Sequence, residues 1–153
     1  MKREEIIQAI SEKFREMSTE TIMFHQAVAD VLGLHITDHK CLDLIYRFGA
    51  MPAGRLGELT GLTTGAVTGM IDRLEEAGYV RRTNDPKDRR RTIVEPTRNR
   101  KLDRKIEVIF IPLHERMHKL LSSYSDSELA FLLDATTEFI EQTREESKRL
   151  RSL

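Results

Sequence analysis

Four glycines in the first half of the chain limit most strongly what this sequence can fold into. Each follows a stretch of residues compatible with a helix, and they are Gly33, Gly49, Gly61 and Gly78. Glycine adopts the left-handed conformation just past the last helical turn at little cost, so it commonly ends a helix. The four glycines therefore divide the first half of the chain into four helices.

Apolar residues recur at helical spacing in these segments. The first helix is expected from Lys2 to Leu32. Ser18 and Thr19 mark the place where it is expected to bend or break. The second helix is expected to begin after Thr37, because threonine is a favourable N-cap.

The third helix is predicted to be short, with Pro52 in its first turn. The fourth is predicted to begin at Thr63 or Thr64. Its apolar residues recur every three or four positions, at Val67, Met70, Ile71 and Leu74. This spacing predicts one buried face on the fourth helix.

Two more helices are predicted in the last third of the chain. One spans about 98–123 and contains Pro112, where a kink is expected because proline removes a backbone hydrogen bond. The last helix is expected to begin at Ser125, where Ser125 and Glu128 have the spacing of a capping box.

The one clear strand signal lies between these two sets of helices. Segments 79–82 and 91–94 are rich in β-branched and aromatic residues and flank a charged stretch. Asp85 and Pro86 suit the first two positions of a type I turn. The sequence therefore predicts a mainly α fold with a small β-hairpin.

The formal net charge of the chain is zero, but the charge is unevenly distributed. Residues 79–105 hold eleven basic and four acidic side chains, a formal charge of +7, so the remaining residues together carry −7. A concentrated basic stretch on a neutral protein is the electrostatic mark of a contact with a polyanion.

The third and fourth helices are separated by a turn of about three residues, which is the spacing of a helix-turn-helix. With its apolar residues turned inward, the fourth helix presents a face of small residues, flanked by Arg73. That face consists of Thr64, Gly65, Ala66, Thr68 and Gly69. Small residues permit close approach to the major groove, and threonines can contact phosphates or base edges. A glycine inside a helix costs about 1 kcal/mol relative to alanine, a cost that close approach to DNA would explain.

The hairpin supplies the cations that this face lacks. Arg89, Arg90 and Arg91 follow the turn, and an arginine held at a hairpin tip can enter a narrow minor groove. Asp85 and Asp88 are expected to orient these arginines or to close the turn. The sequence thus predicts double-stranded DNA as a partner, bound by a winged helix-turn-helix.

The stretch from Leu56 to Val94 resembles the MarR family of transcription regulators. The matching motifs are Gly61-Leu62, Ala66-Val67-Thr68, Asp72-Arg73-Leu74-Glu75, Gly78-Tyr79-Val80-Arg81-Arg82 and Asp85-Pro86-Lys87-Asp88-Arg89-Arg90. The order of the helices on either side also fits, so the resemblance covers nearly the whole chain.

The resemblance implies a single MarR-like domain over residues 1–153, with a winged helix-turn-helix unit at 37–97. It implies that 1–33 and 98–153 form a helical dimerisation region, and that Arg90 is the arginine of the wing that enters the minor groove. It further implies a homodimer, usually a repressor that binds a pseudo-palindromic operator and is often released by a small ligand.

The long terminal helices favour a homodimer on their own account. Each carries an apolar stripe, and a central unit of about sixty residues has too little surface to cover both. Such stripes usually bury against a second copy of the chain. An extended bundle within one chain is the alternative.

By the same resemblance, an effector crevice is expected where the first, second and fifth helices meet the DNA-reading unit. Its candidate residues are Phe24, His25, Val28, His35 and Ile45. For each of them, ordinary core packing is the alternative interpretation.

His114 and His118 lie four residues apart on one predicted helix and could share a metal ion, which would make the chain a metal-sensing regulator. The sequence places no third ligand beside them, although Asp38, His39 and Asp43 are candidates. We therefore expect no metal site and no cofactor.

The sequence contains no nucleophile elbow, phosphate-binding glycine loop or zinc-hydrolase motif, so we expect no catalytic residues and no enzyme. The alternative of a different class is an adaptor that binds proteins through the same fold. The wing arginines favour DNA, because an adaptor has no need for them.

No apolar stretch approaches the length that spans a bilayer, and the N-terminus has no apolar signal core. The single cysteine, Cys41, is expected to be buried and inert, and its isolation fits a reducing compartment. The sequence therefore predicts a cytoplasmic protein that makes no membrane contact.

Overall fold

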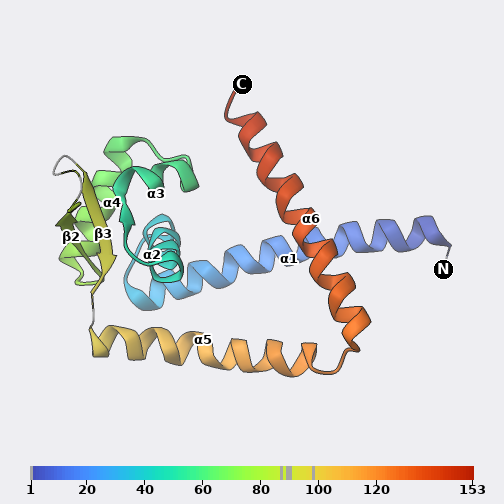
Figure 1. Cartoon of the computed structure of the whole chain (residues 1–153). Coiled ribbons are helices and arrows are strands. Elements are labelled where there is room, and N and C mark those ends of the chain that lie inside the picture. The colour runs from blue at the N-terminus through green and yellow to red at the C-terminus, as the bar shows by residue number, and fades with distance from the viewer. Residues whose placement is uncertain (1, 87, 89–90, 98) are drawn as a thin grey trace. The chain divides into compact units, whose positions relative to one another are not determined.

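The computed structural model describes residues 2–86, 88, 91–97 and 99–153, with the side chain of Lys101 left out. Figure 1 shows the order of its elements. They are α1 (Arg3–Leu32), α2 (Ile36–Phe48), β1 (Met51–Pro52), α3 (Ala53–Thr60), α4 (Thr64–Glu76), β2 (Val80–Asn84), β3 (Thr92–Pro96), α5 (Arg100–Leu121) and α6 (Asp126–Leu150). The chain divides into two compact units, Met1–Leu102 and Asp103–Leu153.

The predicted helix ends are confirmed in the first unit. Gly33, Gly49, Gly61 and Gly78 all have positive φ, between 70° and 78°. Thr63 caps α4, since its hydroxyl accepts a hydrogen bond from the backbone N–H of Ala66 at 3.3 Å. The mainly α fold class with a small β-hairpin is therefore confirmed.

The core of the first unit forms around α4. Its apolar residues Val67, Met70, Ile71 and Leu74 are at most 4% exposed. Helix α2 packs against α1, α3 and α4, and contributes the buried residues Cys41, Leu42 and Ile45. Figure 1 shows the N-terminal part of α1 extending beyond α2, which agrees with the exposed side chains there.

Helices α3 and α4 approach each other closely at Gly57. A Cβ atom at this position would lie 3.3 Å from the backbone oxygen of Leu62 and 3.6 Å from Val67. The absence of a side chain at Gly57 therefore permits the tight helix-turn-helix.

The hairpin is part of a three-stranded antiparallel sheet in the order β1-β3-β2. In this sheet Arg82 pairs with Val94, and Asn84 with Thr92. Strands β2 and β3 end at Asn84 and Pro96, each two residues after the predicted end. The short strand β1 was not predicted from the sequence. It adds to the outer edge of β3 through Met51 opposite Val94, a pairing between residues far apart in the chain.

Two predicted helix features are wrong. Helix α2 begins at Ile36 with His35 at the N-cap position, two residues before the predicted cap at Thr37. The backbone N–H of His39 already donates to the carbonyl of His35 at 2.9 Å. Helix α1 is one helix through Ser18 and Thr19, so the break that the sequence allowed there is wrong. The Thr19 hydroxyl donates to the carbonyl of Arg15 at 3.2 Å, so it is satisfied within the helix.

The second unit consists of most of α5 followed by α6. Helix α5 continues through Pro112 without interruption. The predicted capping box of α6 is confirmed, because Ser125 N–H donates to the Glu128 carboxylate at 2.8 Å and the Ser125 hydroxyl accepts from Glu128 N–H. In the described part of the chain, no helix is both long and apolar enough to cross a membrane.

Candidate nucleic-acid interface

The N-terminal half of α4 presents the predicted face of small residues to the outside. Thr64, Gly65, Ala66 and Thr68 are exposed, and Gly69 is half-buried. They lie opposite the buried face because apolar residues at a period of 3.6 fix the rotation of the helix. The structure thus brings these candidate residues together on one surface.

Gly65 has open space where a side chain would be. A Cβ atom at Gly65 would have no neighbour within 4 Å, unlike the one at Gly57. Internal packing therefore gives no reason for glycine at this position.

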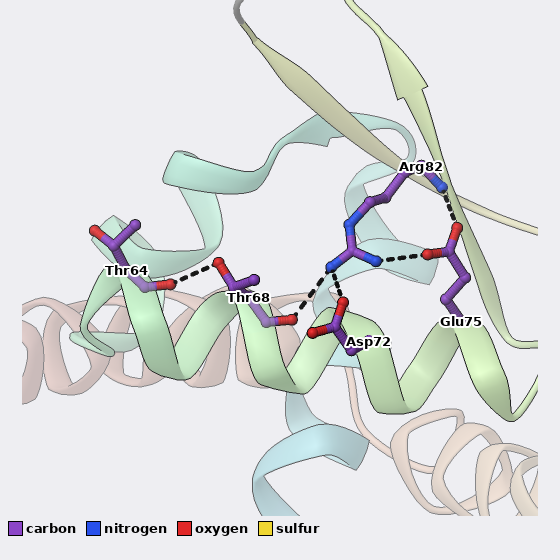
Figure 2. Close-up of polar contacts among 5 residues, drawn as sticks. All are labelled: Thr64, Thr68, Asp72, Glu75 and Arg82. Carbon is purple, nitrogen blue, oxygen red and sulfur yellow. Dashed lines mark hydrogen bonds and ion pairs between the residues drawn. The ribbon is translucent and has the colours of Figure 1, made fainter.

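One side chain of this face, that of Thr68, forms a hydrogen bond within the helix. The Thr68 hydroxyl donates to the backbone oxygen of Thr64 at 3.0 Å, as Figure 2 shows. A hydroxyl that donates its hydrogen inward keeps its oxygen lone pairs for a donor from outside.

Arg73, a predicted DNA contact, is held by a partner that the sequence did not reveal. Its Nε and Nη2 each donate to Asp38 at 2.7 Å, which makes a bidentate pair between α4 and α2. The Asp38 side chain is only 2% exposed, whereas that of Arg73 is 51% exposed. The hydrogen bond to Asp38 raises the pKa of Arg73 above its ordinary value. The pair fixes α4 on α2.

Arg82 on β2 makes a second link to α4. Its Nη1 donates to Glu75 at 2.5 Å, and its Nη2 donates to Asp72 at 2.5 Å and to the backbone oxygen of Thr68 at 3.2 Å. Its backbone N–H donates to the other oxygen of Glu75 at 2.8 Å. Figure 2 shows the guanidinium reaching from the strand to these groups along the helix.

These hydrogen bonds hold Glu75 in its ionised form. The backbone N–H of Arg82, and then its side chain, lower the pKa of Glu75. Burial lowers the pKa of Arg82, but its bonds to Glu75 and Asp72 outweigh that effect and raise it. The sequence showed Arg82 only as part of a basic run, and its carboxylate partners lie 7 and 10 residues earlier.

The turn between β2 and β3 carries the remaining predicted DNA contacts. Arg89 and Arg90 lie outside the described residues. Asp85 N–H donates to the carbonyl of Arg91 at 3.0 Å, and Arg91 N–H donates to the carbonyl of Asp88 at 2.9 Å. The backbone of Asp85 and Asp88 thus helps to close the turn, and Arg91 is exposed beside it. We call β2, residues 85–91 and β3 the wing.

The arginines between Thr64 and Asn84 are all engaged with carboxylates of the same chain. Arg73 pairs with Asp38, Arg81 with Glu95 at 2.6 Å, and Arg82 with Asp72 and Glu75. In the sequence, residues 85–91 hold four basic and two acidic side chains, so the turn of the wing carries a formal charge of +2.

The effector candidates fall into different environments. Val28 and Ile45 are buried in the core, and His35 is exposed at the start of α2. Phe24 and His25 are half-buried, with their rings edge to face at 5.6 Å. The structure adds His39, whose Nε2 lies 3.0 Å from Nδ1 of His25.

The two other candidate groups are Cys41 and the histidines of α5. The expected burial of Cys41 is confirmed, with 0% exposure, and burial raises the pKa of its thiol to about 11. A thiol of that pKa is a poor nucleophile at neutral pH. His114 and His118 are exposed on α5, and the described residues contain no cluster of three or more metal-ligating side chains.

The first unit has the architecture of a winged helix-turn-helix. The sequence model of the MarR family matches residues 34–92. A protein of Bacillus subtilis (strain 168), described as the uncharacterized HTH-type transcriptional regulator YcgE, is 41% identical over 149 residues. That match covers 97% of this chain and 96% of that protein.

Solved structures show the same fold. The transcriptional regulator Tm0710 from Thermotoga maritima superposes with a TM-score of 0.61 at 27% identity, covering 91% of this chain and 96% of that one. FabT from Streptococcus pneumoniae, solved in complex with DNA, gives a TM-score of 0.69 at 20% identity, covering 91% and 98%.

The fold and the exposed face of α4 therefore define a DNA-binding protein of the winged helix-turn-helix class. The chain belongs to the MarR family, whose members are transcriptional regulators and not enzymes. The predicted family and the predicted class of function are confirmed.

The histidine pair makes stability depend on pH. Burial lowers the pKa of His25, and burial followed by the charge of His25 lowers the pKa of His39, both below the ordinary 6.5. Below about pH 6.5 the unfolded chain therefore binds more protons at these two histidines than the folded chain does. As far as it depends on this pair, the free energy of unfolding is highest above this pH and declines as the pH falls. We expect the urea midpoint to drop between about pH 7.5 and about pH 5.5, and to drop less in His39→Gln.

The control for this prediction is His118→Gln, which removes an exposed histidine of α5. It should keep the pH dependence of the wild type. An identical loss of stability on acidification in His39→Gln and wild type would show that the pair does not contribute.

Proposed function

We propose that the chain is a sequence-specific transcriptional repressor that binds a pseudo-palindromic operator as a homodimer in the cytoplasm and is released by a small ligand. The observation that carries the DNA-binding part is the exposed N-terminal face of α4 next to the basic turn of the wing. In this proposal the major groove is faced by the small residues of α4, with Arg73 beside them. These residues are Thr64, Gly65, Ala66, Thr68 and Gly69. Arg89, Arg90 and Arg91 lie along the flanking minor groove.

The chemistry of the two elements supports different tasks. The face of α4 is small and hydroxyl-bearing, so it contributes close fit and hydrogen bonds, in which the Thr68 oxygen accepts from donors on base edges. The turn of the wing carries the excess positive charge, so it contributes most of the electrostatic attraction. Asp85 and Asp88 help to hold that turn in place, while the flanking Arg73 serves chiefly to fix α4 on Asp38.

The homodimer is supported by the apolar side chains that each unit exposes. On α1, Ile6, Ile7 and Ile10 are between 44% and 50% exposed. In the second unit, Val108 and Phe131 are 69% and 70% exposed. A chain of this size rarely leaves such extended apolar stripes in water, and a two-fold symmetric partner would cover them.

The repressor assignment and the ligand rest on the family, whose relatives include the named transcriptional regulators above. A ligand would enter beside the half-buried Phe24 and His25, at the junction of α1 with α2. Val28 and Ile45 would form the floor of that site, with His35 at its edge.

We predict that the purified protein binds a duplex from its own promoter with an affinity that falls steeply as salt rises. Each neutralised phosphate contributes a slope of about −0.9 to the plot of log affinity against log salt. Arg90→Ala should weaken binding about tenfold or more, the scale of one specific contact worth ~1–3 kcal/mol. Fluorescence anisotropy with a labelled duplex measures both effects.

Two controls accompany this titration. A scrambled duplex of equal length should bind more weakly than the promoter duplex, and Arg81→Ala should bind like wild type, because Arg81 is engaged with Glu95 on the sheet. A flat salt dependence, or equal affinity for both duplexes, would contradict sequence-specific DNA binding.

We predict that the chain has twice its monomer mass of 17.7 kDa in solution at micromolar concentration. Ile10→Glu, which puts a charge in the apolar stripe of α1, should shift the mass towards the monomer. Gln8→Glu introduces the same charge at an exposed polar position of the helix and should remain a dimer. Sedimentation equilibrium gives the masses, and a monomeric wild type would overturn the homodimer.

We predict that Gly65→Ala raises stability and lowers DNA affinity. The added methyl group has open space in the free chain, and alanine in a helix is about 0.5–1 kcal/mol more favourable than glycine. The same group should meet the DNA if α4 fits closely in the groove. Thermal unfolding and anisotropy measure the two changes, and unchanged affinity would refute the close fit. Because the two effects have opposite signs, unfolding cannot explain weaker binding.

A further inference from the structure

We propose that Arg82 is a positioning residue that sets the placement of the wing on α4 and thereby the fit of the wing in the minor groove, without contacting DNA itself. This inference rests on the proposed DNA binding. It concerns a residue whose positive charge, from sequence alone, belongs to the basic surface of the hairpin.

Arg82 is bound to one continuous face of α4. Its partners Thr68, Asp72 and Glu75 are spaced by four and three residues, which places them above one another on the helix. Figure 2 shows all three directed towards the same guanidinium. The contact therefore fixes β2 along two turns of α4 rather than at a single point.

The contact uses the side chain and the backbone of the same strand residue. Glu75 accepts from the Arg82 guanidinium with one oxygen and from the Arg82 backbone N–H with the other. Such a carboxylate fixes the strand itself, and not only the end of a flexible side chain. Arg82 lies two residues before Asn84, the last residue of β2 before the turn, so the fixed point is close to the basic turn.

The exposed fraction of the Arg82 side chain agrees with a guanidinium that forms its ion pairs within the chain. The Arg82 side chain is 27% exposed, less than the side chains of Asp72 at 61% and Glu75 at 38%. The neighbouring Arg81 is 65% exposed and pairs within the sheet, with Glu95. Two adjacent arginines of one strand thus have different tasks, and Arg82 is the one that joins the wing to α4.

The geometry requires arginine rather than any cation. The planar guanidinium has five N–H donors in a fixed arrangement, and here it serves three acceptors at once. A lysine would keep the positive charge but would offer a single nitrogen on a flexible chain. Charge and positioning can therefore be separated by substitution.

The test compares Arg82→Lys with Arg82→Gln, using the full-length protein and the promoter duplex. If Arg82 positions the wing, both variants should lose at least about tenfold in affinity, the scale of one lost base contact. If Arg82 binds a phosphate, Arg82→Lys should remain close to wild type while Arg82→Gln is weakened. Arg81→Lys is the matched control and should change affinity by less than about twofold, since exposed ion pairs contribute little.

A second measurement asks through which groups Arg82 acts. In the background Asp72→Asn with Glu75→Gln, the carboxylates that hold Arg82 are neutral, so adding Arg82→Gln should have little further effect. A direct DNA contact would give the same loss in both backgrounds, and that result would overturn the proposal.

A third measurement separates positioning from stabilisation of the fold. In Arg82→Lys, hydroxyl-radical protection of the minor groove at the wing should be lost, while protection of guanine N7 in the major groove by α4 should persist. A variant that only unfolds more easily would keep the wild-type protection pattern in its folded fraction, which would overturn the proposal. If the wild type does not bind the duplex, both the proposed function and this inference are overturned. If the wild type binds and Arg82→Lys gives the same protection pattern on the DNA as the wild type, this inference alone is overturned.

Discussion

The burial of one face of α4 is the interaction on which the rest of the first unit depends. Val67, Met70, Ile71 and Leu74 are at most 4% exposed and pack where α2, α3 and the sheet meet. Removing one such buried side chain typically costs about 2–5 kcal/mol, a large part of the stability of a small domain. Because this face is fixed inward, the opposite face, with Thr64 and Thr68, is fixed outward.

Two arginine–carboxylate contacts complete the positioning of α4. Asp38 holds Arg73 from α2, and Arg82 holds Asp72 and Glu75 from β2. Hydrophobic burial is non-directional, so it leaves small rotations and shifts of the helix inexpensive, whereas bidentate hydrogen bonds have defined geometry. The same contacts neutralise acids close to the proposed DNA surface, which leaves the turn of the wing as its basic part.

The sequence predicted the local parts of this arrangement well. Rules that operate within a few residues gave the start of α4 at Thr63 or Thr64, the capping box at Ser125, the helix ends at the glycines and the buried residues of α4. The sequence also predicted the hairpin, but both strands end two residues later than predicted. The end of a strand depends on pairing across the sheet, which a local pattern does not show. The short strand β1 was missed because two residues carry no periodic signal.

The candidate DNA-binding site divides in the same way. The sequence by itself determined that α4 has a small, exposed N-terminal half and that a basic hairpin follows it, because periodicity and composition are local properties. Only the tertiary structure decided which cations are already paired. Asp38 lies 35 residues from Arg73, and Asp72 lies 10 residues from Arg82, so packing alone brings these charges together and assigns each arginine its partner.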